Sequence, residues 1–326
     1  MSSFCDIRAM KPYDILLCGT IVLTMLLGSS FIPFIGIFLS MGVPQVFLYY
    51  GIKLGLTQGS FVAAGAMLLV SAAAMITGYT YLIVFCAEYA ILGLLLSECF
   101  RREYPTDRTT FLGTVMVCTF SGIFMFSMSV LYNTSIGNLI KVYIDNQMAI
   151  VSAAYRDIGV SSIGDIDISR YIESFKAILV RLFPGIITVS VIAIVWMNTV
   201  IARPLLRLLK LQIPLSDDGV RLDLWCAPEW LVWSLITSGF GVFLGEGWAL
   251  SLSLNAVLVI SAVYFFNGMS IILFYFNKHN VSSVVRVIVY MLIAIQQLLM
   301  VLIVLAGIFD QWFDFRKLKK KIDIDG

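Results

Sequence analysis

The chain has 326 residues, of which 60% are hydrophobic and 13% charged, and its formal net charge is +2. Soluble domains carry about 25% charged residues, so a water-soluble fold of this length could not bury so much apolar surface, whereas a bilayer requires it. The small net charge and the scattering of basic residues over loops argue against a nucleic-acid partner.

Metal, cofactor and hydrolase chemistry lack their usual residues in this sequence. The six cysteines include no CxxC pair, and His279 is the only histidine. A zinc centre, a disulfide framework and a Ser-His-Asp triad are therefore poorly supported. Walker A, HExxH, GxSxG and GxGxxG motifs are also absent from the sequence, so we assign no catalytic residue, no metal ligand and no cofactor.

Apolar segments long enough to cross a bilayer follow one another along the chain, since about 20 helical residues span roughly 30 Å of hydrocarbon. Residues 13–50 and 60–97 are each too long for one crossing and predict two helical hairpins, joined by a loop at 51–59. The turns within the hairpins are expected at 28–33 and 77–78. Further spans are predicted at 111–132, 178–202, 230–246, 251–276 and 286–309.

The distribution of Lys and Arg orients these spans, because cytoplasmic loops accumulate positive charge. The pattern predicts a cytoplasmic N-terminus, but three full crossings after residue 229 would place the basic segment 316–321 outside. We therefore favour an all-α polytopic membrane helix bundle with eight full crossings, both termini cytoplasmic and a re-entrant segment at 251–276. An irregular backbone is expected at Asn267–Gly268, a pair that is unfavourable inside a helix. Nine crossings are the alternative.

The sequence divides into three predicted parts. Residues 1–137 form an N-terminal membrane portion of five helices, and residues 178–326 form a C-terminal membrane portion with a basic cytoplasmic tail. Between them, 138–177 repeats apolar residues at helical spacing among charged ones. This pattern predicts an amphipathic helical insertion outside the membrane.

Aromatic and basic residues mark the ends of the late spans. Trp is enriched at membrane–water interfaces, and basic residues bind the anionic leaflet. The acid pair Asp310 and Asp314 exceeds what such anchoring requires. The predicted interface anchors are Trp225, Trp230, Trp233, Trp312 and Arg316.

Glu88 is the foremost candidate for a binding residue, because it lies near the midpoint of an apolar span. An ionised carboxylate at the bilayer centre costs about 3 kcal/mol or more, and such residues usually face a bundle interior or a cavity. Tyr81 lies seven positions earlier on the same helical face. The alternative of equal weight is a protonated glutamate that makes one interhelical hydrogen bond.

Several amide side chains also lie inside the predicted spans. Each of them alone is better explained by an interhelical hydrogen bond, worth about 0.6 kcal/mol on average. Asn267 is the exception, because an Asn-Gly pair within a span could offer free backbone groups to a ligand. The candidate ligand-binding residues are therefore Glu88, Tyr81, Asn255, Asn267 and Gln296.

Several motifs carry a family resemblance over nearly the whole chain. They include "LFPGIITVSVIAIVWMNTVIARPLLR" at 182–207, "YFFNGMSIILFYFNK" at 264–278 and "GIFDQWFDFRKL" at 307–318. On these motifs the chain resembles the YybS-like bacterial membrane proteins, the domain of unknown function 2232. The resemblance implies a location in the bacterial cytoplasmic (inner) membrane, and it carries no activity with it.

The N-terminal half is also similar in layout to the substrate-binding subunits of energy-coupling-factor vitamin transporters. Those subunits are six-helix membrane proteins that dock a partner transmembrane subunit through small-residue faces. Their alanine-rich docking motif is not evident in "DILLCGTIVLTMLLG" at 14–28. The likeness therefore does not extend to docking on a shared transporter module.

Three functional hypotheses follow, all with the lipid bilayer as the first partner. The first is a membrane protein that binds or transports a small-molecule ligand within the helix bundle around Glu88. The second is a non-transporting scaffold or assembly protein that engages a membrane protein partner through 138–177 and the basic tail. The third is a membrane enzyme acting on lipid-type substrates, for which only Asp310 and Asp314 approach the required pair of acids.

Overall fold

A computed structural model describes residues 10–31, 33–157, 162–163, 166–209, 211 and 222–317. The predicted basic tail beyond residue 317 lies outside these ranges. The described chain is almost entirely helical, which confirms the all-α prediction. It forms two compact units, unit 1 with Met1–Tyr132 and Ser190–Val220, and unit 2 with Asn133–Val189 and Arg221–Gly326. The three-part division at residues 137 and 177 stays a prediction.

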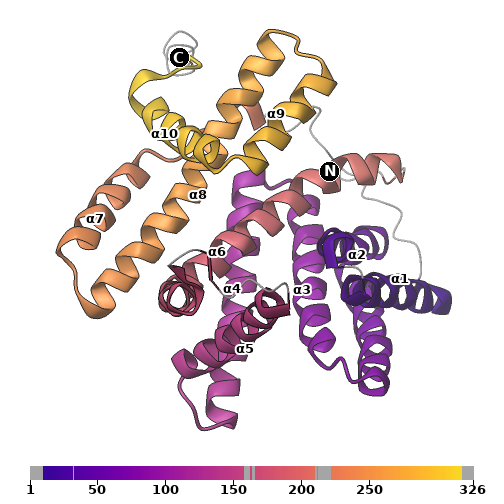
Figure 1. The fold of residues 1–326 in the computed structure, drawn as a ribbon. Coiled ribbons are helices and arrows are strands. Elements are labelled where there is room, and N and C mark those ends of the chain that lie inside the picture. The colour runs from indigo at the N-terminus through magenta and orange to yellow at the C-terminus, as the bar shows by residue number, and fades with distance from the viewer. Residues whose placement is uncertain are drawn as a thin grey trace. The chain divides into compact units, whose positions relative to one another are not determined.

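Unit 1 is a bundle in which successive helices pack against each other (Figure 1). Its helices are α1 (Pro12–Phe31), α2 (Pro33–Thr77), α3 (Tyr81–Arg101), α4 (Thr106–Leu131) and the C-terminal part of α6 (Ile168–Leu208). The helix boundaries at 31–33 and 77–81 confirm both predicted turns. Small residues on the facing sides allow close packing, and the buried core includes Cys18, Val22, Phe47, Ala66, Val70, Ala74 and Cys86.

The expected loop at 51–59 is reduced to a single residue. Gly55 interrupts α2 with φ 81° and ψ 165°, a conformation that only glycine adopts readily. A Cβ on Gly59 would lie 2.9 Å from the Cα of Gly51, although residues eight apart in a straight helix are separated by about 12 Å. The chain therefore turns sharply at Gly55, and the two halves of α2 are separate rods.

Unit 2 contains α5 (Ile136–Asp157), the first part of α6, the 3₁₀ turn η1 (Leu222–Leu224), α7 (Trp230–Leu244), α8 (Gly247–Lys278), α9 (Ser283–Ile295) and α10 (Gln297–Phe313). The two-residue strands β1 (Ser162–Ile163) and β2 (Ile166–Asp167) pair antiparallel, with Ser162 opposite Asp167. Helices α7 and α8 form a hairpin, and α10 packs along α8 (Figure 1). Within the segment 138–177, the structure is helical up to Asp157 in α5 and again from Ile168 in α6, and its placement outside the membrane stays a prediction.

The predicted irregularity at Asn267–Gly268 is wrong, because α8 is one continuous helix through this pair. The glycine serves packing instead. A Cβ on Gly268 would lie 2.2 Å from the carbonyl oxygen of Ile303 in α10, so only glycine allows the two helices to approach this closely. The irregular backbone lies elsewhere, at Gln296, where α9 and α10 meet with a bend of 103°.

Within the described part of the chain, six helices are long and apolar enough to cross a membrane, and seven if the bent α9–α10 pair counts as one span. Helix α7 is apolar but has only 15 residues. These helices define a multi-pass membrane protein. The expected number of eight or nine crossings is not established by these helices and stays a prediction.

Candidate functional site

Glu88 is a half-buried residue of α3 in unit 1, and its side chain contacts α4. The hydroxyl Oγ of Ser121 on α4 donates a hydrogen bond of 2.5 Å to Glu88 Oε1. Among the described residues, the ion pairs are formed by other carboxylates, and no cation pairs with Glu88. The carboxyl group is therefore held in an apolar span by one hydroxyl donor, an arrangement that leaves its second oxygen available to a proton or a bound cationic group.

Tyr81 does not join Glu88 in one site. Its side chain is 47% exposed at the start of α3. Its ring contacts Tyr79 and Phe85 edge to face, with ring centroids 5.9 Å and 6.2 Å away. Seven helical residues also separate it from Glu88 by about 10 Å along the axis.

Asn255 in unit 2 fastens α8 to the first part of α6. Its Oδ1 accepts a 2.6 Å hydrogen bond from the amide of Gly185, and its Nδ2 donates to the carbonyl of Arg181 at 2.9 Å. The amide of Gly185 and the carbonyl of Arg181 are the donor and acceptor of one rung of an α-helix. Asn255 thus engages both groups of this rung, which supports the interhelical role over a free ligand-binding amide.

An open groove with a volume of about 620 Å³ lies beside this contact in unit 2. Its lining includes Arg181, Pro184 and Leu252 as well as Asn255, and it is mostly apolar. Asn255 already uses both ends of its amide in the contact with α6. Arg181 is the one charged residue in the lining of the groove.

Arg316 and Asp310 form a buried ion pair in unit 2, with 2.6 Å between Arg316 Nη2 and Asp310 Oδ2. Nη2 also donates to Oδ1 of Asn267 at 3.1 Å. Nη1 donates to the backbone carbonyls of Asp223 and Trp225 at 3.0 Å and 2.8 Å. We call these five residues the Arg316 cluster. It joins the chain before α7, the middle of α8 and the end of α10.

Most of the remaining polar atoms around this cluster are also engaged, although the buried Nε of Arg316 has no hydrogen-bond partner among the described residues. Asp310 Oδ1 accepts the amide of Phe315 at 3.0 Å, and Asn267 Nδ2 donates to the carbonyl of Gly307 at 2.8 Å. Arg316 Nη2 further lies 3.2 Å from the sulfur of Cys226. Hydrogen bonds to the other positions of a buried charge pair help to offset the cost of removing the two charges from water.

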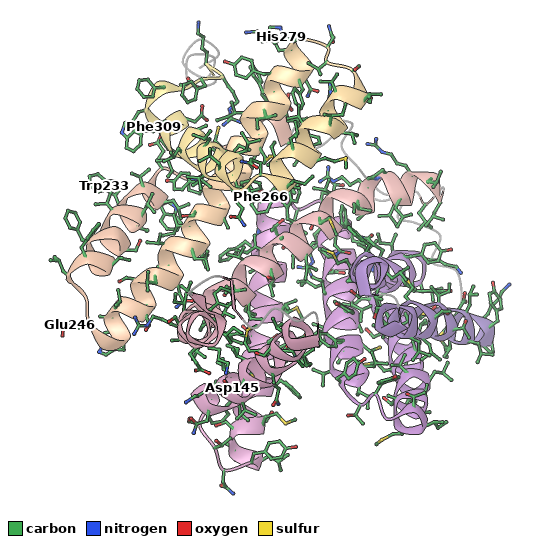
Figure 2. The ribbon with its side chains drawn as sticks, in the orientation of Figure 1. Asp145, Trp233, Glu246, Phe266, His279 and Phe309 are labelled. Atoms are coloured by element: carbon green, nitrogen blue, oxygen red, sulfur yellow. The ribbon has the colours of Figure 1, made fainter. Side chains whose placement is uncertain are left out.

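The structure corrects the anchoring role expected for Arg316. The residue is 4% exposed, so its guanidinium binds protein groups and is not available to lipid headgroups. The tryptophans differ: Trp230, Trp233 and Trp312 are 64%, 71% and 62% exposed. Figure 2 shows Trp233 on the outer side of α7. Their role at the membrane interface, with that of the half-buried Trp225, stays a prediction.

The sequence contained one signal for the cluster, the surplus acid Asp310. What could not be foreseen is the left-handed backbone of Asp314, with φ 42°, which ends α10 and turns the chain back. This turn brings Arg316 next to an aspartate six residues earlier. The parts played by Asp223 and Cys226 depend on tertiary contacts alone and had no signal in the sequence.

Within each unit, the candidate ligand-binding residues lie apart from one another. Glu88 and Tyr81 belong to unit 1. In unit 2, Asn255 and Asn267 lie twelve residues apart on α8, about 18 Å along the helix. Gln296 is exposed at the bend between α9 and α10. Among these residues, only Asn267 joins a cluster of charged groups.

The apolar helices and the buried polar contacts between them are those of an integral, multi-pass membrane protein. The chain belongs to the family described as "Predicted membrane protein (DUF2232)", which it matches over residues 20–311. It is similar to "Uncharacterized protein YybS" of Bacillus subtilis (strain 168), with 23% identity over 311 residues, or 95% of this chain and 97% of the relative. No solved structure shows a significant match. The family resemblance noted in the sequence is thereby confirmed.

Proposed function

We propose that this membrane protein binds a small solute within unit 1, with Glu88 as the group that pairs with a proton or a cationic part of the solute. The observation that carries the proposal is a carboxyl group in an apolar span with one hydroxyl donor and no cation partner among the described residues. Carboxyl groups in such positions usually mark solute or proton paths, because placing an ionisable group in the hydrocarbon region is energetically unfavourable and is found mainly where the group has a function.

Glu88→Gln tests this proposal, since it preserves the shape and the hydrogen bond to Ser121 but removes the negative charge. Protein purified in mild detergent is examined by native mass spectrometry for a co-purifying small molecule. We expect the wild type to carry such an adduct and Glu88→Gln to lose it, with affinity lower by roughly 10- to 100-fold, as for the loss of a charged hydrogen bond. Glu98→Gln is the matched control, because Glu98 lies on the same helix and pairs with Arg102. An adduct of equal abundance in Glu88→Gln rejects the proposal.

A scaffold or assembly role is the second candidate, and the Arg316 cluster favours it for unit 2. The arginine there has protein acceptors on both terminal nitrogens, so the cluster holds helices together. A protein that shows no solute adduct but co-purifies with a defined membrane partner would support this alternative.

We further propose that both termini are cytoplasmic and that α9 and α10 form the re-entrant segment. The hydroxyl of Tyr275, near the end of α8, donates to the carbonyl of Phe315, just after α10, at 3.0 Å. The chain that leaves α8 therefore returns to the same end of unit 2, whereas a single crossing between them would separate the two ends by a bilayer. Figure 2 marks the ends of α8 by Glu246 and His279. Lys278 lies at the His279 end of α8, which agrees with a cytoplasmic location.

In unit 1, the ion pair between Asp14 and Lys53, 2.8 Å long, supports an even number of crossings between these two residues. It brings the start of α1 next to the turn at Gly55, so the two helical rods between them make one outward and one return crossing. Counting the halves of α2 separately, with α1, α3, α4, α6, α7 and α8, gives eight crossings. The re-entrant pair adds none.

Labelling of single introduced cysteines with a membrane-impermeant maleimide tests this topology in intact cells. We expect Lys317→Cys and His279→Cys to react only after the cells are opened, and Glu246→Cys, at the other end of α8, to react in intact cells. Labelling of Lys317→Cys from outside, with His279→Cys protected, would contradict the re-entrant pair and restore a ninth crossing.

A further inference from the structure

The bend between α9 and α10 presents two adjacent amide side chains in an apolar setting. Gln296 and Gln297 are both exposed, and neither side chain has a hydrogen-bond partner among the described residues of unit 2. The flanking residues Ile295 and Leu298 are 75% and 64% exposed. No side chain caps the first turn of α10 either.

The re-entrant arrangement proposed above would place this bend near the middle of the bilayer. Helix α9 has 13 residues and is therefore about 20 Å long. With a change of direction of 103° at Gln296, a symmetric V with arms of this length reaches a depth of about 15 Å. This is half of a hydrocarbon core of about 30 Å.

Exposed amides and an uncapped helix start are costly at that depth, because lipid tails offer no hydrogen bonds. Irregular backbone is tolerated there when protein covers it or when it lines a water-filled cavity. The apolar neighbours of the bend, among them Met291 with 58% exposure, do not suit a water path. A covering protein surface fits the exposed residues better.

We propose that the α9–α10 bend is covered by the same bend of a second copy of this chain, across a two-fold axis. A carboxamide carries both donors and acceptors, so Gln296 and Gln297 are complementary to themselves. An isologous contact satisfies the same groups on both copies at once. The exposed apolar side chains on either side then pack in the rim of this contact. The inference rests on the re-entrant placement, but not on the role of Glu88.

Oxidative cross-linking in native membranes tests the proposal. Gln296→Cys is expected to give a disulfide-linked dimer as the major species. The unmodified chain, which contains the native cysteines, is expected to remain monomeric on a non-reducing gel. Phe243→Cys is the matched control, because this α7 residue is 88% exposed but lies far from the bend along the chain. A dimer of equal yield in Phe243→Cys would mean random collision and would overturn the proposal.

A second measurement separates the amide contact from mere proximity. We expect Gln296→Leu to weaken dimerisation in detergent by roughly tenfold, since each dimer loses two interhelical amide contacts. A wild type that is monomeric in mild detergent, or a Gln296→Cys variant that reacts with a water-soluble maleimide and does not cross-link, overturns the proposal. If the topology labelling gives the expected pattern but the cross-linking and dimerisation results do not, only the contact with a second copy is rejected. If the topology labelling fails, the depth assigned to the bend is rejected as well.

Discussion

Arg316→Ala is expected to destabilise unit 2 by about 3–5 kcal/mol, because it leaves the buried carboxylate of Asp310 without its charge partner. The change also removes the donors to Asn267 and to the carbonyls of Asp223 and Trp225. For a unit of this size the midpoint of thermal unfolding should fall by about 10 °C. Circular dichroism of the purified protein in detergent measures this shift.

Lys317→Ala is the matched control, since the neighbouring residue is exposed and takes part in no ion pair among the described residues. We expect its midpoint to stay close to that of the wild type. The double variant Asp310→Asn, Arg316→Met should recover part of the loss, because no unpaired charge is then buried. An Arg316→Ala protein that melts with the wild type would contradict the structural role of the cluster.

Gly307→Ala has the second large expected effect, through the contact between α8 and α10. The added Cβ would lie 2.1 Å from the carbonyl oxygen of Tyr264 and 2.9 Å from the amide nitrogen of Gly268. Both groups are backbone, so the helices must separate, at a cost of about 1–3 kcal/mol. The separation also weakens the hydrogen bond from Asn267 to the carbonyl of Gly307.

The matched control for this change is Gly239→Ala on α7, where the structure has nothing within 4 Å of an added Cβ. Alanine has the higher helix propensity, so this variant should be as stable as the wild type or slightly more stable. Size-exclusion chromatography after stepwise heating compares the folded fractions. Equal heat resistance of the two variants would show that α8 and α10 do not pack through their glycines.

Much of the architecture could be predicted from the sequence because a bilayer imposes strong, local requirements. Runs of apolar residues must be helical there, since every backbone group needs a hydrogen bond within its own segment. The turns near 31–33 and 77–81 and the helical nature of 136–157 are visible for this reason. The membrane class and the family likewise depend on features that extend over the whole chain.

The sequence does not predict two features with the same ease. One is the turn at Gly55, and the other is the position of the bend between α9 and α10. Glycine is permissive in either a turn or a close helix contact, so its sequence position does not distinguish these roles. At Gly55 the backbone turns, whereas at Gly268 it stays helical and touches α10. The break falls instead at Gln296, a residue with an ordinary helix propensity.

The sequence by itself determined that this protein is an all-α, multi-pass membrane protein, because hydropathy and helical length are properties of single segments. Only the tertiary structure decided the partner of each polar residue. Arg316 has the sequence context of a surface anchor, yet the left-handed turn at Asp314 carries it into the protein to meet Asp310 and Asn267. Glu88 meets Ser121 from another helix in the same way. Such pairings depend on how helices distant in the chain approach each other, and no local pattern encodes that approach.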